Sequence, residues 1–582
     1  MKNKNISDIF EEISDILSVS DKPTSRFEVR AYKRAALTIG TLQEDVSDIY
    51  RRGGINALME LPGIGKGLAT EIEEYIKTGK ISKYEELKKE YPIDFNDLLN
   101  IEGIGPKTAI LLYKKLNITN LESLKKALEG HKIKDLPGFG VKSEQVIADG
   151  IRMHESNKGR ILLSDGLNEA EKIISILSKS GKVEKVVISG STRRMRETLG
   201  DLDILAISNY PEDVMNIFSN MEDVNGIVVK GPTKTTVSLN IATTCDLRVI
   251  EPHSFGAALQ YFTGSKDHNI KVRKIAIEKG YKLNEYGLFD KSGKIISESD
   301  EKEIYNKLGM QYIPPEMRED RGEIELALKN QIPNLVDISD IKGDLHTHTK
   351  ETDGINTIEE MAAYAIKKSY QYIATTNHTK SLKVAHGLTD EQFENYFNKV
   401  DILNDKLKGK LKILKGAEVD ILKDGTLDLK DSTLDTMDCV VGAVHTNTNM
   451  DENAMTSRVL KAINTGYINI LAHPTGRLIN ERDPYQIDLI KIAEACNNTK
   501  TALEINASPS RLDLNDTNIL STSKLNPLYS VDTDAHSTIN MDFMKYGIGT
   551  ARRGWLTKES VIDTFDLNKL LKFLKKEKKL TN

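Results

Sequence analysis

Seven short apolar runs, each followed by a helix-like segment, fill the chain from about residue 341 onward. The runs are GDLHTH, QYIATTNH, LKILKGAEVD, CVVGAVH, INILAHP, ALEINAS and YSVDTDAH. Strands that alternate with helices predict βα units and a parallel sheet, and seven consecutive units favour closure into a barrel. This alternation restricts the topology of residues 341–575 more strongly than any other pattern restricts the rest of the chain.

Histidine and carboxylate side chains gather at the ends of these runs. Seven of the eleven histidines in the chain follow residue 340. In parallel βα folds, functional residues collect at the carboxyl ends of the strands. Imidazole and carboxylate groups together suit Zn²⁺, Mn²⁺ or Fe²⁺, and so many of them exceed the needs of one ion, which predicts two or three ions with bridging ligands. The nine candidate ligands are His346, His348, Asp353, His378, Glu418, His445, His473, Asp534 and His536.

A single histidine at a strand end is more often structural than metal-binding. The repetition of the pattern instead favours a metal site that activates water and stabilises a phosphate leaving group. Two nearby residues, His386 and Arg477, are candidates for orienting a phosphate, with a plain surface role as the alternative for both.

A second group of carboxylates lies upstream, where a helical segment and several short apolar strands predict an α+β domain. Within GSTRRMRETLGDLDILA, Asp201 and Asp203 are two apart on a predicted strand, so their side chains share a face. Asp246 begins a later strand. Three carboxylates on one face repel each other unless they hold divalent cations, and two Mg²⁺ (or Mn²⁺) ions suit a phosphoryl displacement.

The turn that precedes these aspartates is a candidate phosphate cradle. Gly190 and Ser191 follow the apolar strand VVIS, so their backbone amides and the serine hydroxyl could bind a phosphate. Arginines in the same motif, including Arg194, add positive charge. A surface turn with solvated aspartates is the alternative. The combination of turn, arginines and later aspartate favours a nucleotidyltransferase palm.

Three glycine hairpins interrupt the first 157 residues, whose apolar periodicity is otherwise helical. They are LPGIG, IEGIG and LPGFG, and each joins two helical segments. Paired glycines let the backbone approach a ligand closely, and amides at the next helix N-terminus can hold a DNA phosphate. A plain joint between helices is the alternative, but three copies favour DNA binding, and they resemble helix-hairpin-helix motifs. The candidate DNA-contacting residues are Gly63, Gly65, Lys66, Gly103, Gly105, Lys107, Gly138 and Gly140.

Length and composition limit the class of protein. A chain of 582 residues predicts three or four domains, and a net charge of −5 means that any contact with DNA is local. Three cysteines without a CxxC pair suit a reducing cytosol. The N-terminal segment does not have the pattern of a signal peptide, and no apolar run is long enough to span a membrane. We expect a cytoplasmic, nucleoid-associated protein with no membrane partner.

The segment FGAALQYFTGSKDHNIKVRKIA narrows the class further. YFTGS followed by HN resembles the nucleotide-side wall of family X DNA polymerases, and the resemblance runs from the N-terminal helices to about residue 316. The C-terminal ligand pattern resembles a PHP domain, which polymerases share with histidinol-phosphate phosphatases. The order of segments is similar to that of bacterial and archaeal family X polymerases with a C-terminal PHP domain.

This resemblance implies a multidomain α+β and α/β chain. It has a helical helix-hairpin-helix N-terminal region, a nucleotidyltransferase-type palm and a distorted seven-stranded (β/α) PHP barrel. A proline pair and dense charge near residues 311–325 predict a boundary. The expected domains are a lyase-like helical domain (1–90), a helical DNA-binding subdomain (91–157), the palm (158–253), a nucleotide-side subdomain (254–316), a linker (317–340) and the barrel (341–575).

The resemblance also implies roles for individual residues. Asp201, Asp203 and Asp246 match the metal-binding catalytic carboxylates. Tyr261 and Phe262 match the wall that packs against the incoming sugar and disfavours a ribose. Without the resemblance to the family, packing in an aromatic core would be the better interpretation of these two residues. The remaining positions that match nucleotide contacts are Gly190, Ser191, Arg194, Gly264, Asn269 and Arg273.

The implied activity is template-directed filling of short gaps in DNA repair, including base excision repair, by a monomer that uses dNTPs and gapped or primer–template DNA. The palm would use two Mg²⁺ or Mn²⁺ ions. The barrel would hold two or three Zn²⁺ or Mn²⁺ ions, or Fe²⁺, and act as a 3′–5′ exonuclease or cleave at abasic sites. The alternatives are a barrel that hydrolyses phosphomonoesters or only stabilises the fold, a non-catalytic DNA-end binding protein, and a template-independent or RNA-tailing nucleotidyltransferase.

Three positions depart from the family pattern. Glu71 stands where vertebrate repair members have a lysine that forms a Schiff base with an abasic sugar, and a carboxylate cannot form an imine. We therefore expect no such lyase chemistry, although Lys33 or Lys66 could still bind a 5′ phosphate. Leu199 replaces a polar residue, which predicts fewer triphosphate contacts. Asn377 replaces an aspartate beside His378, outside the set of direct ligands.

Overall fold

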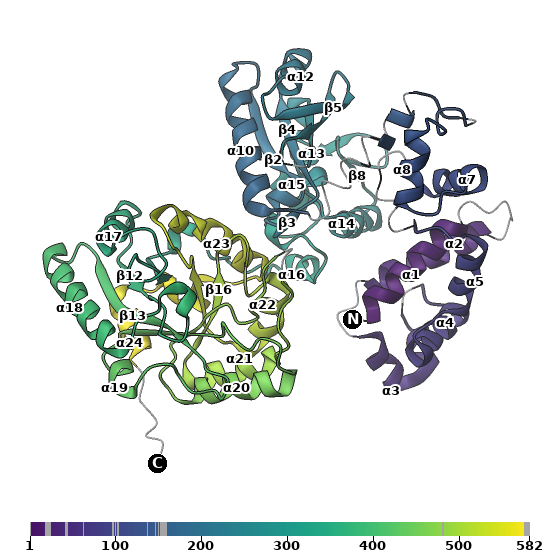
Figure 1. Ribbon diagram of the computed structural model, residues 1–582. Helices are drawn as coiled ribbons and strands as arrows, with labels where there is room; N and C mark the ends of the chain where they lie inside the picture. Colours follow the sequence, from purple (N-terminus) through teal and green to yellow (C-terminus); the bar gives the residue numbers. More distant parts are fainter. Residues whose placement is uncertain are drawn as a thin grey trace. The chain divides into compact units, whose positions relative to one another are not determined.

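The computed structural model describes residues 2–17, 25–40, 45–61, 63–95, 98, 101, 104–136, 138–141, 143–145, 147–148, 151, 160–241, 243–479 and 482–575. The chain divides into two compact units, Met1–Gly159 and Arg160–Asn582 (Figure 1). Among the helices in the described ranges, none combines the length and the apolar character that crossing a membrane requires.

All the described secondary-structure elements of the first unit are helices, as the sequence predicted. One apolar core surrounds Phe10 and Ile72, and a second surrounds Phe95 and Leu124. The first two hairpins lead into helices, because Gly65 and Gly105 are the N-cap residues of α4 and α7. The helices are α1 (Lys2–Leu17), α2 (Ser25–Gly40), α3 (Val46–Met59), α4 (Lys66–Thr78), α5 (Ser82–Glu90), α7 (Pro106–Leu116) and α8 (Leu121–Glu129).

The palm contains a five-stranded sheet in the order β2-β4-β7-β6-β5. Strands β4 and β7 are parallel, and the other neighbouring pairs are antiparallel. Apolar side chains of the sheet, such as Leu202 and Ile204, pack against α10 and α12. Because side chains alternate along a strand, Asp201 and Asp203 point to the opposite face. The elements are β1 (Ile161–Leu162), α10 (Leu163–Lys179), β2 (Lys185–Ser189), α11 (Gly190–Arg193), β3 (Thr198–Leu199), β4 (Asp201–Ile207), α12 (Pro211–Ser219), β5 (Val224–Lys230), β6 (Lys234–Leu239) and β7 (Thr244–Ile250).

The nucleotide-side subdomain combines helices with a three-stranded antiparallel sheet in the order β10-β9-β8. Residues 317–340, which the sequence predicted to be a linker, are folded: Ile324 and Leu335 belong to the same apolar core as Val272. The elements are η1 (Pro252–Ser254), α13 (Phe255–Thr263), α14 (Lys266–Glu278), β8 (Lys282–Asn284), β9 (Gly287–Phe289), β10 (Ile295–Ser297), α15 (Glu301–Lys307), η2 (Pro315–Met317), α16 (Glu323–Leu328) and η3 (Ile338–Asp340).

The predicted barrel is confirmed. Its seven parallel strands lie in sequence order, and a bridge between Thr347 and Ala535 brings the ends of the first and last strands together. Figure 1 shows the helices arranged around these strands. The strands are β11 (Gly343–Thr347), β12 (Tyr372–Thr375), β13 (Lys412–Asp420), β14 (Cys439–Ala443), β15 (Ile470–Leu471), β16 (Ala502–Asn506) and β17 (Tyr529–Asp532).

Two apolar layers hold the barrel together. The larger layer lies between the strands and their helices, around residues such as Phe393 and Val459. The smaller layer includes Leu345 and Val441 and is completed by Leu570 of α24. The helices are α17 (Ile358–Lys367), η4 (Lys383–Ala385), α18 (Asp390–Leu407), α19 (Asp431–Leu434), α20 (Glu452–Asn464), α21 (Leu489–Thr499), α22 (Asp516–Thr522), η5 (Ser523–Leu525), η6 (Thr538–Phe543), α23 (Met544–Arg553), η7 (Lys558–Ser560), η8 (Ile562–Thr564) and α24 (Leu567–Leu574).

The palm and the barrel share apolar packing. Three barrel residues, Ile479, Leu512 and Tyr546, belong to the core that forms beneath the palm sheet. Ion pairs add to this contact, including Arg477 with Glu197 at 2.6 Å. The palm and the barrel are therefore packed together within one compact unit, Arg160–Asn582.

The packing of α24 predicts a stability effect. Leu570 is fully buried in the smaller apolar layer of the barrel. Leu570→Ala should lower the free energy of unfolding of this unit by about 2–5 kcal/mol, because it removes buried apolar surface and leaves a cavity. Chemical denaturation followed by circular dichroism measures the change. Lys572→Ala, at an exposed position on the same helix, should have little effect, and equal loss in both variants would contradict the packing argument.

Candidate active sites

The three palm aspartates lie together at the ends of two neighbouring strands. Asp203 of β4 stands opposite Asp246 of β7 in the parallel register, and Asp201 lies two residues earlier on β4. Burial, followed by the charges of Asp201 and Asp246, raises the pKa of Asp203 to about 7. Burial and the charge of Asp246 also raise the pKa of Asp201. This crowding favours the binding of cations, because a divalent ion would offset the repulsion between the carboxylates.

The glycine–serine turn fits tightly against this carboxylate group. Gly190 has a φ of 62°, and a Cβ atom there would lie 2.1 Å from Oδ2 of Asp203, so only glycine is accommodated. The hydroxyls of Ser189, Ser191 and Thr192 are buried without a hydrogen-bond partner among the described residues. Buried hydroxyls normally have partners, so this turn has unused hydrogen-bonding capacity that suits a phosphate. The roles of Gly190 and Ser191 in triphosphate binding stay predictions.

Arg194 lies beside this turn but is already paired. Its Nε donates to Oε1 of Glu319 at 3.1 Å, and one of its terminal nitrogens donates to the carbonyl oxygen of Thr263. The neighbouring Arg193 forms a bidentate pair with Glu301 at 2.8 and 2.9 Å, which joins the palm to the nucleotide-side subdomain. A guanidinium has five N–H donors, so contact with a triphosphate would use those that these two hydrogen bonds leave over.

The aromatic pair occupies the end of α13. Tyr261 and Phe262 pack edge to face with ring centroids 5.1 Å apart, and both are only partly buried. This exposure argues against a core role and suits a wall for a ligand. Asn269 supports the pair, since its Nδ2 donates to the carbonyl oxygen of Tyr261 at 2.7 Å. Arg273 donates to the carbonyl oxygen of Asn269 at 3.3 Å, and Gly264 lies against Arg194.

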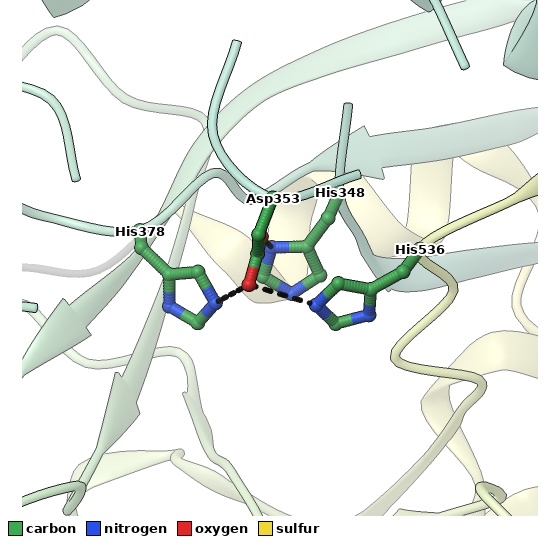
Figure 2. Close-up of side chains that lie close together, drawn as sticks. All are labelled: His348, Asp353, His378 and His536. Atoms are coloured by element: carbon green, nitrogen blue, oxygen red, sulfur yellow. Dashed lines mark ion pairs between the residues drawn. The ribbon is translucent and has the colours of Figure 1, made fainter. Parts of the chain in front are cut away.

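All nine candidate ligands of the barrel converge. Three groups of side chains offer ligand atoms close enough to hold one ion each. Figure 2 shows one of them, in which Asp353 points between His378 and His536, at 3.2 and 3.3 Å. The three groups are His348, Asp353, His378 and His536; His346, His348 and Asp534; and His378, Glu418 and His445. The ninth residue, His473, contacts Glu418 at 2.9 Å.

Several buried ligand atoms of the barrel form no hydrogen bond within the described part of the chain, although carboxylates and imidazoles lie within ion-pair distance of each other, and this suits metal ions. Nε2 of His346, both ring nitrogens of His348 and Oε2 of Glu418 are buried without a hydrogen-bond partner among the described residues. Leaving buried polar atoms unpaired is costly. Metal ions of the expected kinds would satisfy imidazole nitrogens and carboxylate oxygens at the same time.

Charges in the barrel site are strongly coupled. Burial opposes protonation of His378, yet Glu418 and Asp353 raise the pKa of its imidazole to about 10. Burial and the neighbouring rings of His378 and His536 lower the pKa of His348 to about 3. Because metal ligation requires neutral imidazoles, metal binding should release protons from residues such as His378.

The structure adds residues that the sequence did not predict. Glu504 contacts Nδ1 of His346 at 2.6 Å, and Asp420 contacts Nδ1 of His445 at 2.9 Å. Such carboxylates orient imidazole ligands from outside the metal site. Both lie in strand runs that the sequence revealed, so their position near strand ends was the available signal. Asn377 is fully buried and accepts a hydrogen bond from the amide of Thr349, which agrees with a place outside the direct ligands.

Arg477 is bound to the palm. Its side chain is 9% exposed, and it forms a bidentate pair with Glu197 of the palm at 2.6 and 3.1 Å. It also donates to the carbonyl oxygen of Leu512. This arginine therefore joins the barrel to the palm, and its role toward a phosphate stays a prediction. His386 is exposed in the 3₁₀ region after Lys383–Ala385, and nothing in its surroundings tests its predicted role.

The hairpin residues lie on the surface of the helical unit. Lys66 and Lys107 are exposed in the first turns of α4 and α7, where they follow Gly65 and Gly105. Gly63 and Gly138 have φ angles of 83° and 87°. Gly140 is partly exposed in the third hairpin, and Gly103 lies outside the described residues. These positions suit contact with DNA phosphates, and the individual contacts stay predictions.

Glu71 and Leu199 have structural surroundings of their own. The hydroxyl of Tyr32 donates to both carboxylate oxygens of Glu71, at 2.7 and 2.9 Å. Burial raises the pKa of Glu71. Leu199 is fully buried and pairs with Ile161 in the palm. Glu71 offers no amine to an abasic sugar, and Leu199 offers no polar group to a triphosphate.

Four family models match the chain. They are the helix-hairpin-helix domain at residues 1–81, the SAM-like helix-hairpin-helix tandem at 95–153, the DNA polymerase beta thumb at 258–319 and the PHP domain at 344–508.

Relatives match the whole chain or large parts of it. The DNA polymerase/3′-5′ exonuclease PolX of Bacillus subtilis is 38% identical over 579 residues, which cover 99% of this chain and 100% of that protein. A probable phosphatase of Thermoanaerobacter is 29% identical over 247 residues, or 40% of this chain and 95% of that protein. DNA polymerase lambda of Arabidopsis thaliana is 24% identical over 354 residues, or 54% of this chain and 62% of that protein.

Helix-hairpin-helix segments, a polymerase thumb and a PHP barrel in one chain define a class of DNA-binding, metal-dependent phosphoryl-transfer proteins. Identity over the full length narrows the class, and the chain belongs to the family X DNA polymerases with a C-terminal PHP domain. Membership implies DNA as a substrate and divalent metal ions at both sites.

The contact between Glu504 and His346 predicts an effect on metal affinity. Glu504→Gln should weaken metal binding in the barrel by about 10–100-fold, because the imidazole loses the carboxylate that orients it. Competition with a chelator, followed by release of Mn²⁺ or Zn²⁺, measures this change. Glu494→Gln, at an exposed position of α21, is the matched control. Equal affinity in the wild type and Glu504→Gln would remove the orienting role.

Proposed function

We propose that the protein is a DNA-directed DNA polymerase that fills short gaps during DNA repair, including base excision repair. Its barrel acts as a metal-dependent 3′–5′ exonuclease that trims primer ends. It works as a monomer on gapped or primer–template DNA and uses dNTPs. The observation that carries the polymerase proposal is the placement of Asp203 opposite Asp246, with Asp201 beside them and Gly190 packed directly against them.

The palm residues divide the work of nucleotide transfer. Two Mg²⁺ or Mn²⁺ ions held by Asp201, Asp203 and Asp246 supply charge neutralisation for the attacking and leaving oxygens. Gly190 brings backbone amides close to the triphosphate, and the unpaired hydroxyl of Ser191 donates to it. These groups are held in place before the substrate arrives, which favours the transition state.

The nucleotide-side wall selects the sugar. Tyr261 and Phe262 are partly exposed at the end of α13, where they pack against a deoxyribose and leave no room for a 2′ hydroxyl. Asn269 fixes this wall through the carbonyl oxygen of Tyr261. Base-side contacts come from Arg273.

The barrel residues bind and orient the scissile phosphate group. Two or three Zn²⁺ or Mn²⁺ ions, with Fe²⁺ as an alternative, supply an activated water and neutralise the leaving oxygen. Asp353, Glu418 and Asp534 each lie within ion-pair distance of at least two histidines, so each is placed to bridge ligand groups. Glu504 and Asp420 hold the rings of His346 and His445.

A second function for the barrel is favoured by one observation. The Thermoanaerobacter relative that matches it is named a probable phosphatase. The barrel would then hydrolyse phosphomonoesters. Comparing hydrolysis of p-nitrophenyl phosphate with shortening of a DNA 3′ end distinguishes the two activities, and turnover of the small ester alone would exclude the exonuclease.

The two-site proposal predicts separable losses of activity. Asp201→Ala should lower filling of a one-nucleotide gap by about 10³-fold or more and spare primer shortening, because it removes a ligand of the palm only. His346→Ala with His348→Ala should do the reverse. Primer extension on a gap with a 5′ phosphate, in Mg²⁺ and separately in Mn²⁺, measures both activities. Loss of both activities in either folded variant is incompatible with two independent sites, and no extension by the wild type excludes the polymerase.

The sugar wall predicts discrimination against ribonucleotides. Tyr261→Ala should reduce the preference for dNTPs over rNTPs by about tenfold or more, because the wall loses its packing against the sugar. The ratio of kcat/KM for a dNTP and its matching rNTP measures this preference. Tyr286→Ala, at an exposed position of the same subdomain, should leave it unchanged. Ready use of rNTPs by the wild type would remove the role of Tyr261 and Phe262.

A further inference from the structure

The palm segment that follows the phosphate turn is held by the barrel. The carbonyl oxygen of Arg194 accepts a hydrogen bond from a terminal nitrogen of Arg553 at 2.8 Å. Met195 of this segment packs closely on Gly549 of the barrel. A Cβ atom added to Gly549 would lie 2.5 Å from the Cε atom of Met195. The carboxylate of Glu197 in the palm forms a bidentate pair with Arg477 of the barrel. Barrel residues thus contact three of the four residues in the segment 194–197.

The backbone of this segment depends on such support. Met195 has a φ of 54°, in the left-handed region that a long L side chain rarely adopts. A conformation of this kind persists when surrounding contacts determine it. The segment leads directly from the Gly190–Ser191 turn to Asp201, so a shift here would move both the phosphate cradle and a metal-binding carboxylate.

Arg553 also shares a carboxylate with Arg194. Its two terminal nitrogens contact Glu319 at 3.0 Å and Asp516 at 2.6 Å, and its side chain is only 3% exposed. Glu319 accepts from Nε of Arg194 at 3.1 Å. The charge of Glu319 is therefore divided between two arginines, of which one belongs to the barrel and the other adjoins the triphosphate cradle.

Removing Arg553 would change the state of Arg194. Glu319 would then keep Arg194 as its nearest cationic partner, since Arg196 lies at 3.9 Å. A buried carboxylate that has lost one of two cationic partners keeps an uncompensated charge, which attracts the remaining arginine. The guanidinium of Arg194 would be less available for a triphosphate, and the turn would lose the hydrogen bond to its carbonyl oxygen.

We infer that the barrel is a structural part of the polymerase nucleotide site, in which Arg553 and Arg477 are positioning residues that fix the segment 194–197 and keep Arg194 available to the triphosphate. The inference rests on the proposed polymerase function. It assigns the barrel a second role that requires none of its nine metal ligands. It also gives a role to the buried pair of Arg477 with Glu197.

Steady-state kinetics of Arg553→Gln test the inference. On a one-nucleotide gap, KM for the dNTP should rise about tenfold while kcat changes less than about threefold, because binding of the triphosphate is weakened before the chemical step. Primer shortening by the barrel should stay within about twofold of the wild type. The thermal unfolding midpoint and the emission of Trp555, the single tryptophan of the chain, check that the junction is folded.

Arg552→Gln is the matched control. Arg552 precedes Arg553 on α23 and is also bound across the junction, but to Glu316 and to the carbonyl oxygen of Val336 instead of the segment 194–197. The variant Arg552→Gln should leave KM for the dNTP unchanged. An equal rise of KM in both variants would mean that any loosening of the junction has this effect, and it would overturn the assignment to Arg553.

The second contact gives an independent test if Arg553→Gln does not fold. Glu197→Gln should also raise KM for the dNTP about tenfold, and the charge exchange Glu197→Arg with Arg477→Glu should restore part of the loss. An unchanged KM in the folded variants overturns the inference. The wild-type protein is measured in the same assay. If the wild type incorporates no dNTP, the proposed polymerase function fails; if it incorporates dNTPs and the variants have an unchanged KM, only the inference about the barrel fails.

Discussion

Charged and polar ligand groups that rigid strands hold side by side in buried positions are the constraint on which both sites depend. In the palm, the parallel register of β4 and β7 places Asp203 opposite Asp246, and neither strand can move without disturbing the core beneath it. In the barrel, Glu418 is fully enclosed among histidines at strand ends. Buried charged side chains oppose folding locally, and the apolar layers around them offset the free-energy cost of their burial. Divalent cations would remove the repulsion between the palm aspartates and bind the imidazoles and carboxylates of the barrel, which ties metal binding to the architecture.

Much of this arrangement follows from sequence pattern. Strand alternation predicted the barrel, and the position of each ligand at a strand end predicted that the nine ligands would meet. The spacing of Asp201 and Asp203 likewise predicted a shared face. These predictions succeed because strand periodicity and parallel topology determine where side chains point, with no need to know the packing of distant segments.

Contacts between distant segments could not be predicted in the same way. Glu504 meets His346 across 158 positions of sequence, and Arg477 meets Glu197 across 280. Which side chains meet across the barrel, and which side of a strand-end loop faces the palm, depends on packing that no local pattern records. The same reason accounts for residues 317–340, where charge and prolines suggested a linker but Ile324 and Leu335 are enclosed in a core.

The shared packing of palm and barrel changes how the two activities relate. A tethered nuclease would contact the polymerase only through a linker. Here Leu512 and Tyr546 of the barrel complete the palm core, and Arg553 bonds directly to the palm backbone. The polymerase turn and the barrel are consequently parts of one body. A substitution in the barrel can therefore alter nucleotide binding without touching the nuclease ligands.

The most direct test of two metal-dependent sites is anomalous diffraction from crystals of the full-length protein with Mn²⁺, gapped DNA that ends in a dideoxynucleotide, and a dNTP. The account predicts manganese peaks between Asp201, Asp203 and Asp246, and separate peaks among the barrel histidines and carboxylates. A bound nucleotide with no metal at the three aspartates, or an empty barrel in the presence of excess Mn²⁺ and Zn²⁺, would contradict it.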